Sequence, residues 1–172
     1  MKYLYYNNID LIPLYIKQQI SENIYSVEDL LNDLIRGIES ENYLFMFLVD
    51  GKKLVGLLGI AYLSSTIKKK MKLKFTEKTY HLGNVFIMPN YRGKGLCKKM
   101  VEEIKSHVIK KGIARRLKLD VEENNIPAIK CYTSTGFHLY KNRLAQKWLN
   151  DNWEKNYGFK PSGKMLIYTV KL

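Results

Sequence analysis

The sequence is poor in cysteine and offers no grouping of metal ligands. Cys97 and Cys131 are its only cysteines, and neither their spacing nor a nearby histidine pattern resembles a zinc site or a thioredoxin-type site. Both lie in segments with a helical pattern, where an unpaired cysteine is usually a small buried apolar residue. We therefore predict free thiols in a reducing compartment and no bound metal.

Long apolar runs are also missing. No window approaches the roughly 20 apolar residues that a membrane-spanning helix needs. Near the N-terminus, Asp10 and Pro13 interrupt the stretch that a signal peptide would keep apolar. These absences predict a cytoplasmic protein that does not associate with a membrane.

Arginine is scarce, although the chain is strongly basic. The formal net charge is +13, but only 5 of the 29 basic residues are arginine. Basic proteins attract phosphate surfaces, yet the guanidinium group is the one that binds phosphates and bases in a bidentate manner. The densest basic stretch, residues 68–74, contains no interleaved aromatic side chains. A nucleic-acid-binding module is therefore the weakest of the functions considered, and solvated surface lysines account better for the charge.

What the chain does contain is an ordinary globular composition. With 172 residues, 46% apolar and 26% charged, it is long enough to bury a core as one domain, residues 1–172. Ser26 is a predicted N-cap with Asp29 at N3, and Asp50-Gly51 is a strong hairpin turn. The apolar periods predict strands at 2–6, 43–49, 54–63, 80–88, 117–121, 137–141 and 165–171, and helices at 11–20, 27–38, 96–110 and 125–135. Together these elements predict an α/β domain with a mixed sheet.

Two segments are harder to interpret. Residues 70–75 alternate between lysine and apolar residues, which predicts a half-exposed strand with a lysine face. Residues 142–162 hold two tryptophans, Tyr157 and Phe159, and are predicted to be a long connection. Such a loop is either a lid over a site or the local packing of an insertion, and the sequence favours neither.

The stretch NVFIMPNYRGKGLCKKM, residues 84–100, ends a strand at Pro89 and begins a helix after a glycine-rich turn. In such a turn, backbone N–H groups converge at the positive end of the helix dipole, which suits a phosphate group. The dinucleotide fingerprint does not fit, because Lys98 stands where its third glycine belongs. The Walker pattern does not fit either, since no Ser or Thr follows Gly93-Lys94. On its own, a glycine pair is more often only a tight turn.

A second segment further downstream changes this interpretation. In LDVEENNIPAIKCYTSTGF, residues 119–137, the positions of Asn125, Ala128, Ile129 and Tyr132 recur at spacings of three and four. Residues at these spacings share one face of a helix. An amide group and a phenol are therefore expected on the same face.

RGKGLC after the strand NVFIMP, followed by DVEENN..AI..Y...GF, resembles the GNAT superfamily of acyl-CoA-dependent N-acyltransferases. The resemblance is strongest over residues 80–140, and the upstream order of strand, two helices and hairpin agrees with it. In the family the turn has the form Q/R-x-x-G-x-G/A, which Arg92 and Gly95 match. Cys97 departs from the pattern, because the family has Gly or Ala there. The resemblance implies the GNAT fold: a mixed, mostly antiparallel central sheet flanked by helices, in the order strand, helix, helix, strand, strand, strand, helix, strand, helix, strand, strand.

The resemblance also implies a binding site for acetyl-CoA. Backbone groups at the end of the fourth strand would bond the pantetheine arm and help to polarise the thioester carbonyl. The amides of the glycine turn would bind the pyrophosphate, and the Asn125 side chain would contact the pantetheine region. The predicted cofactor-binding residues are Val85, Phe86, Ile87, Arg92, Gly93, Lys94, Gly95, Leu96, Cys97, Lys98, Asn125 and Tyr132.

Three catalytic candidates follow from the same resemblance. Tyr132 occupies the position of the family's general acid, and Asp120 aligns with a carboxylate that serves as general base in some members. His81, on the strand before the turn, could replace Asp120 as the base. The residues alone leave other roles open: Tyr132 as a core residue with its hydroxyl at the surface, and Asp120 as a surface partner of Arg116 or Lys118.

The implied activity is transfer of the acetyl group of acetyl-CoA to an amine by direct attack in a ternary complex. It requires neither a metal nor a covalent enzyme intermediate. The amine acceptor could be a peptide N-terminus, a lysine or a small molecule. A catalytically silent acyl-CoA-binding sensor is an alternative, since it would keep the same turn. The sequence leaves the oligomeric state open, a homo-oligomer included.

Overall fold

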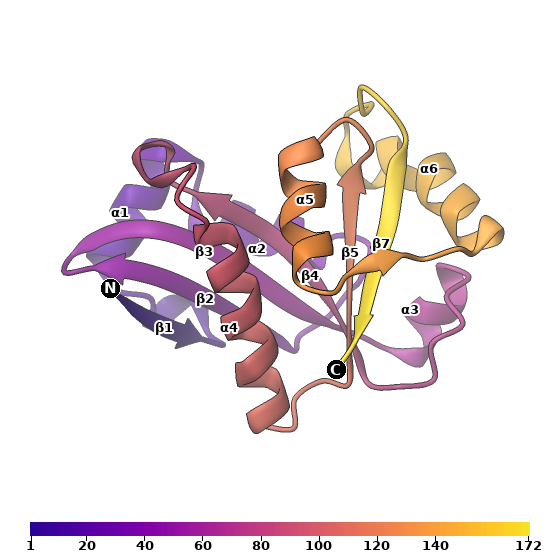
Figure 1. The fold of residues 1–172 in the computed structure, drawn as a ribbon, viewed down its shortest axis with the longest axis horizontal. Coiled ribbons are helices and arrows are strands. Elements are labelled where there is room, and N and C mark those ends of the chain that lie inside the picture. The colour runs from indigo at the N-terminus through magenta and orange to yellow at the C-terminus, as the bar shows by residue number, and fades with distance from the viewer.

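Seven strands form one sheet in the order β1-β2-β3-β4-β5-β7-β6, with helices on both faces (Figure 1). The computed structural model describes all residues from Met1 to Leu172. The elements are β1 (Lys2–Tyr6), η1 (Ile9–Leu11), α1 (Leu14–Asn23), α2 (Val27–Ile35), β2 (Tyr43–Asp50), β3 (Lys53–Leu63), α3 (Ser65–Lys70), β4 (Thr79–Ile87), η2 (Pro89–Tyr91), α4 (Leu96–Lys110), β5 (Arg116–Glu122), α5 (Ile126–Ser134), β6 (His138–Leu139), α6 (Arg143–Tyr157) and β7 (Met165–Lys171). Only the pair β4–β5 is parallel, which confirms the predicted mixed, mostly antiparallel sheet. No helix is both long and apolar enough to cross a membrane.

The local signals predicted for the N-terminal half are present in the structure. The Ser26 hydroxyl accepts a hydrogen bond from the Asp29 backbone N–H at 3.0 Å, and α2 begins there. This helix buries Leu30 and Leu34 in a cluster that it shares with strands β2 and β3. Gly51 takes a φ of +59° in the turn between these strands, as the hairpin signal predicted.

Strands β4 and β5 diverge partway along their length. Their parallel ladder pairs only Thr79–His81 with Arg116–Lys118. Beyond this ladder, β4 continues to Ile87 and β5 to Glu122, but the two strands no longer pair with each other. Figure 1 shows them running apart. Backbone N–H and C=O groups along this split have no sheet partner on that side, so they are free to bind a ligand.

Strand β4 carries a bulge beside the split. Gly59 of β3 faces Gly83, whereas Leu57 faces Phe86, so β4 holds one extra residue between these pairs. Asn84 lies in the bulge with a φ of +53°, which is uncommon for a residue other than glycine. Its side-chain amide donates to the Leu30 carbonyl at 2.6 Å, which ties the bulge to α2.

The lysine-rich segment after β3 is not the strand that we predicted at 70–75. Ser64 caps the short helix α3, and the chain then continues as a loop. Strand β3 is paired on both edges, and so is the start of β4 at Thr79–His81, so neither offers an open edge beside this segment. The alternation is explained by packing instead, because Met71, Leu73 and Phe75 are buried in a cluster with α6.

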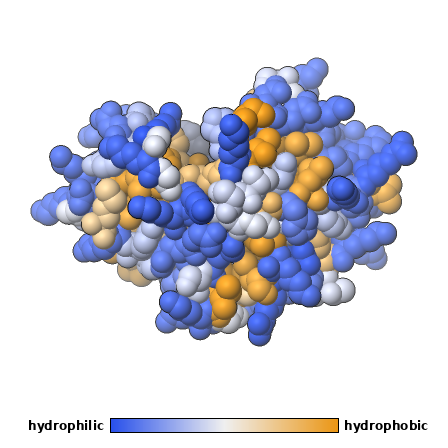
Figure 2. Space-filling model, viewed as in Figure 1, coloured by the Kyte–Doolittle hydropathy of each residue, from blue (hydrophilic) through white to orange (hydrophobic).

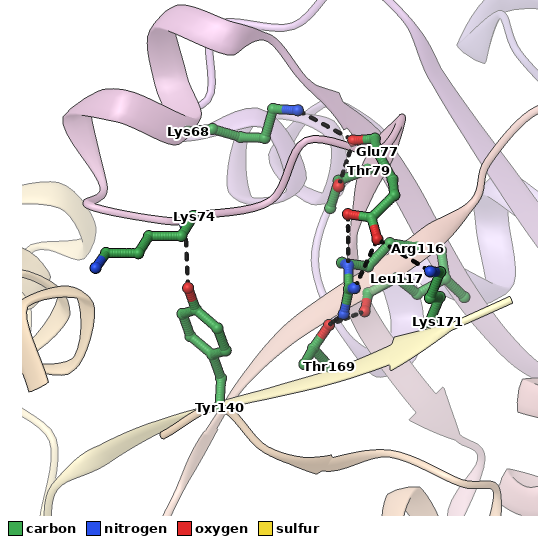
Figure 3. A network of polar contacts seen from close by, with 9 residues as sticks. All are labelled: Lys68, Lys74, Glu77, Thr79, Arg116, Leu117, Tyr140, Thr169 and Lys171. Carbon is green, nitrogen blue, oxygen red and sulfur yellow. Dashed lines mark hydrogen bonds and ion pairs between the residues drawn. The ribbon is translucent and has the colours of Figure 1, made fainter. Parts of the chain in front are cut away.

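A polar network ties this loop to the sheet (Figure 3). The Arg116 guanidinium donates to the Glu77 carboxylate at 3.0 Å and to the Thr169 hydroxyl at 3.2 Å. The hydrogen bond from Arg116 is the largest cause that lowers the pKa of Glu77 to about 2. The Lys68 ammonium is buried and donates to the Glu77 carbonyl at 3.0 Å. The segment is therefore anchored, and at least this lysine has a structural role.

The aromatic segment 142–162 is not a loop either, because most of it forms helix α6. The Asn142 side chain accepts hydrogen bonds from two backbone N–H groups of the first turn, and Gly158 ends the helix in the left-handed conformation. Leu149 and Trp153 lie four residues apart on its buried face. The polar residues between them weaken the helical pattern, which is why the sequence did not predict the helix.

Helix α6 packs on one face of the sheet, where it shares a buried cluster with β7. Leu117 and Leu119 of β5 pack in the cluster that contains α4. Because side chains alternate along a strand, Lys118 and Asp120 point to the opposite face. Their side chains are only 2% and 6% exposed, and they form an ion pair there. The suggestion that Asp120 is a surface residue is therefore wrong, although its pairing with Lys118 is correct.

The two cysteines form a disulfide, which corrects the prediction of free thiols. Cys97 lies in the first turn of α4 and Cys131 in α5, and their Cα atoms are 6.2 Å apart. This separation is within the range that a disulfide bridges. The two helices pack on the same face of the sheet, a contact that no local sequence pattern shows. The inference of a reducing compartment, which rested on free thiols, loses its basis.

Candidate active site

Two cavities open where β4 leaves β5, one on each face of the sheet. We name them the α4–α5 cavity, of about 550 Å³, and the α2–α6 cavity, of about 450 Å³. The α4–α5 cavity is lined by Val85, Phe86, Ile87, Tyr91, Arg92, Gly93, Gly95, Leu96, Cys97, Asn125, Pro127 and Ala128. The α2–α6 cavity is lined by Tyr25, Asp33, Leu34, Arg36, His81, Leu82, Gly83, Asn84, Asp120, Trp153, Tyr157 and Phe159. Consecutive residues of β4 thus line the two cavities, and the bulge lies between them.

The N-terminus of α4 forms one wall of the α4–α5 cavity. Gly93 and Gly95 have positive φ values of +74° and +69°, and a Cβ added at either position would meet open space. Gly95 is the N-cap and offers no side chain, and the N–H groups of Leu96, Cys97 and Lys98 have no backbone partner. Unpaired amides at a helix N-terminus bind anions. In the space-filling view the surface is notched between this turn and α5 (Figure 2). With its unpaired amides, this wall of the cavity fits a phosphate group.

Arg92 and the two lysines of the turn are placed differently. Arg92 lines the cavity, and its Nε donates to the Ile87 carbonyl at 3.0 Å, which joins the turn to the end of β4. Lys94 and Lys98 are exposed and do not line the cavity. Of the predicted cofactor-binding residues, these two lysines and Tyr132 lie outside the cavity wall, and the others line it.

Asn125 has a structural role that the sequence analysis did not predict. It is the N-cap of α5, and its Oδ1 accepts a hydrogen bond from the Ala128 backbone N–H at 3.3 Å. Its Nδ2 remains available to donate to a ligand, so the predicted contact with pantetheine would use that group. Tyr91, Pro127 and Ala128 also line the cavity, although no position of the motif had singled them out as binding residues.

Asp120 and His81 lie together at the start of the split, one on each strand. The Lys118 ammonium donates to Asp120 Oδ2, and Lys118 faces His81 across the β4–β5 ladder. Asp120 Oδ1 and His81 Nδ1 are buried and have no hydrogen-bond partner. No third His, Cys, Asp or Glu joins them in a group that could hold a metal ion. The structure therefore brings the two candidate bases into one cavity.

Burial sets the charge state of His81. Desolvation, the larger cause, and the nearby Lys118 ammonium lower the pKa of His81 from 6.5 to about 4, against the opposing effect of Asp120. The imidazole is therefore neutral at pH 7, where it can accept a hydrogen bond but is a weak base. One oxygen of the Asp120 carboxylate accepts from Lys118, and the other is available to accept a hydrogen bond from a ligand.

Tyr132 lies apart from these two residues. Its ring is buried in the core cluster that contains α4, and its centroid is 6.1 Å from that of Phe137. Burial raises the pKa of Tyr132 to about 12, so the phenol is protonated at neutral pH and can donate a hydrogen bond. It lines neither cavity. This position agrees with the alternative role of a core residue, and its catalytic role stays a prediction.

Of the residues that line the α2–α6 cavity, only His81 and Asp120 were predicted from the sequence as site residues. The other aromatic and charged residues of the lining come from α2 and its flanking residues and from the end of α6: Tyr25, Asp33, Arg36, Trp153, Tyr157 and Phe159. The last three belong to the aromatic segment for which the sequence left open a lid over a site or local packing, and none of the six was predicted to be a site residue. The aromatic residues of 142–162 were visible in the sequence, but their helical period was not recognised. Without that helix, nothing in the sequence shows that these rings approach Asp120.

The sequence model of the acetyltransferase (GNAT) family matches residues 10–137. A curated protein, the probable spermine N(1)-acetyltransferase of Bacillus subtilis subsp. natto, is 41% identical over 56 residues, which are 33% of this chain and 37% of that protein. The matched part thus spans little more than a third of the relative's length.

Solved structures resemble the whole chain. The IAA acetyltransferase from Bacillus cereus has a TM-score of 0.62 at 15% identity, with 99% of this chain and 100% of that chain covered. A GNAT family acetyltransferase from Elizabethkingia anophelis with acetyl-CoA bound has a TM-score of 0.64 at 12% identity, with 99% and 97% covered. At these identities the likeness shows the fold alone. Since the family match covers most of the chain and the fold agrees with it, the chain belongs to the acetyltransferase (GNAT) family.

Proposed function

We propose that this chain is an N-acetyltransferase that transfers the acetyl group of acetyl-CoA to an amine by direct attack in a ternary complex. The observation that carries the proposal is the pair of cavities that open on opposite faces of the sheet and adjoin on β4. Two substrates can enter from the two sides and meet where β4 leaves β5. Membership of the family supports acetyl-CoA as the donor. The name of the curated relative makes polyamines one candidate class of acceptor.

In this proposal acetyl-CoA occupies the α4–α5 cavity. The amides from Gly93 through Lys98 bind its pyrophosphate, because they are unpaired and lie at the positive end of the α4 dipole. Backbone groups of residues 85–87 bond the pantetheine arm along the unpaired edge of β4. The free Nδ2 of Asn125 donates to the same arm from the other wall.

The transfer step forms one bond and breaks one. The amine nitrogen bonds to the thioester carbonyl carbon, the C–S bond breaks, and the products are an N-acetyl amide and the coenzyme A thiolate. The amine must lose a proton, which costs an alkylammonium of pKa near ~10.4 about 4 to 5 kcal/mol at pH 7. Asp120 or His81 accepts that proton, directly or through water. The thiolate, with a reference pKa near ~8.5, takes up the second proton, which the nitrogen loses when the tetrahedral intermediate collapses to the amide. Tyr132 is the proposed stabiliser of the thiolate, and this role requires its hydroxyl to reach the sulfur from the core, since the ring lines neither cavity.

The first experiment is calorimetric titration with acetyl-CoA, followed by thiol release with a panel of amines. We expect binding at micromolar concentrations and release that depends on the amine. Acetyl-CoA binding without release from any amine would favour the sensor alternative.

Tyr132→Phe tests the role of the phenol. We expect kcat to fall by about 100-fold, the usual contribution of a positioned acid, while acetyl-CoA affinity changes little. Tyr168→Phe is the matched control, since Tyr168 is another buried tyrosine of the same core cluster. Unchanged kcat in Tyr132→Phe would remove this tyrosine from the mechanism.

A further inference from the structure

One end of the α2–α6 cavity is walled by aromatic rings. The Trp153 and Tyr157 rings stack with centroids 4.1 Å apart, and Phe159 meets Trp153 edge-on at 5.9 Å. Gly158 ends α6 in the left-handed conformation, so the chain turns and Phe159 joins the rings of the helix. Rings in contact with each other form a preorganised apolar surface of the kind that holds an aromatic or aliphatic body.

Both carboxylates of the cavity already have a cationic partner. The Arg36 guanidinium nitrogen Nη2 lies 2.8 Å from Asp33 Oδ1, and the Lys118 ammonium donates to Asp120. The Tyr25 hydroxyl also donates to Asp33, at 3.0 Å. Since the charges cancel in pairs, the cavity holds no excess negative charge for the second and third ammonium groups of a polyamine.

The aromatic wall does not supply a further cation site. Arg36 already lies over the Tyr157 ring, with its guanidinium carbon 5.8 Å from the ring centroid, and it donates to the Tyr157 carbonyl at 3.3 Å. One face of that ring therefore carries a protein cation. A ligand ammonium placed beside it would be repelled by the guanidinium.

One place remains for a single amine. The buried side-chain polar atoms without a hydrogen-bond partner are Asp120 Oδ1, His81 Nδ1 and Trp153 Nε1, and all three residues line this cavity. Asp120 Oδ1 and His81 Nδ1 can accept hydrogen bonds from one amine nitrogen. Buried polar atoms are normally paired, so unpartnered atoms gathered in one cavity indicate a ligand that pairs with them.

From these features we infer that the acceptor is an amine with a single positive charge on an aromatic or apolar body, and not a polyamine. The inference rests on the proposed N-acetyltransferase function, which it narrows. The amine would bind beside Asp120, and its apolar body would pack on the rings at the end of α6.

The test compares thiol release from acetyl-CoA with phenethylamine and with spermidine. We expect kcat/KM for phenethylamine to exceed that for spermidine by at least about tenfold. Equal or faster turnover of spermidine would overturn this inference and leave the proposed function intact. No turnover of any amine would overturn both, so the two failures are distinguishable.

The aromatic wall is tested by Phe159→Ala, because Phe159 is 55% exposed and its removal should not prevent folding. We expect KM for phenethylamine to rise about fivefold, as one lost aromatic contact implies. The control is Leu144→Ala, an exposed apolar residue of α6 outside the cavity, for which KM should stay within about twofold. Equal KM values in the two variants would contradict the assigned contact.

The charge balance is tested by Arg36→Gln, which leaves Asp33 without its cationic partner. The preference for phenethylamine over spermidine should fall by about fivefold, because the cavity gains a net negative charge. Arg36→Lys keeps the charge and should keep the preference. An unchanged preference in Arg36→Gln would show that paired charges are not what excludes the polyamine.

Discussion

The α4–α5 cavity and the α2–α6 cavity adjoin on the same strand, yet they are built in opposite ways. The walls of the first come from two stretches, 85–97 and 125–128, and include a glycine turn and the backbone of a helix N-terminus. The walls of the second come from four separate stretches and consist largely of aromatic and charged side chains. A short motif can therefore predict the first cavity, whereas the second depends on how α2, β5 and α6 pack.

In the proposed function, this difference separates a donor site made by the backbone from an acceptor site made by side chains. Substitution of one side chain should have its largest effect in the α2–α6 cavity. In the α4–α5 cavity, a substitution should matter most where it changes the backbone, the link between α4 and α5, or the Asn125 side-chain amide.

Asp120→Asn should have the largest effect. It removes the partner of a buried lysine, which typically costs about 3 to 5 kcal/mol of unfolding free energy. It also removes a candidate base, so kcat should fall by about 100-fold or more. Urea denaturation and thiol-release kinetics measure the two effects separately.

A double variant separates the structural role of Asp120 from its chemical one. Lys118→Met combined with Asp120→Leu replaces the ion pair by apolar side chains and should recover most of the stability. Turnover should remain low. Full turnover in this double variant would show that Asp120 acts only as a structural partner of Lys118.

Cys131→Ser tests the one covalent link in the α4–α5 cavity. The disulfide closes a loop with a sequence separation of 34, and chain entropy sets its contribution at about 4 kcal/mol as an upper value. We expect a lower unfolding free energy and weaker acetyl-CoA binding, because α4 and α5 carry the two walls. Reduced wild-type protein should match the variant in both measurements, and a difference between them would contradict this account.

The buried His81 side chain should make the free energy of unfolding depend on pH. Its pKa is about 4 in the folded chain and 6.5 when unfolded, so the unfolded chain takes up the proton first as the pH falls. The contribution of neutral His81 to the free energy of unfolding is complete above pH 6.5. It is lost as the pH falls to about 4, which lowers the free energy of unfolding by about 3 kcal/mol. Denaturation at several pH values should show this slope in the wild type and not in His81→Gln.

The control for this pH dependence is His107→Gln. His107 is half-buried in α4, away from both cavities, and its pKa is lowered mainly by desolvation and then by Lys111. Its removal should change the slope less than removal of His81. A slope that persists unchanged in His81→Gln would mean that another group causes it.

Gly95→Val should have the smallest of these effects on stability but a specific effect on the donor. A β-branched residue at a φ of +69° is strained by about 1 to 3 kcal/mol, so the turn should shift and acetyl-CoA affinity should fall by about 10- to 100-fold. Gly112→Val is the matched control, since Gly112 has a φ of +63° at the other end of α4. Comparable loss of acetyl-CoA affinity in both variants would contradict binding at the turn.

Much of the fold could be predicted because its signals are local. The Ser26 cap, the Asp50-Gly51 turn and the last strand appear where the sequence placed them. Helix α6 was missed even though its cap residues, Asn142 and Gly158, are of the expected types. Its apolar residues are sparse, and a wide polar face hid their period.

The residues that line the cavities also divide into those that local sequence signals predict and those that depend on packing. The glycine turn and the end of β4 were predicted because neighbours in the chain remain neighbours in space. The burial of Lys118 was not predicted. Polar and apolar residues alternate along β5 in the same way whether the polar side of the strand faces water or is covered by α6. Only the packing of α6 distinguishes the two.

The sequence by itself determined most of the elements, the glycine turn and the family, because each depends on residues close together in the chain; helix α6 and the loop at 70–75 are the exceptions. Tertiary structure alone decided three things: the disulfide between α4 and α5, the buried pair of Lys118 with Asp120, and the aromatic wall of the α2–α6 cavity. The disulfide and the aromatic wall join segments that are far apart in sequence. The burial of Lys118 and Asp120 depends on α6, which lies further along the chain. Such contacts form only when helices pack on the sheet and exclude water from between them.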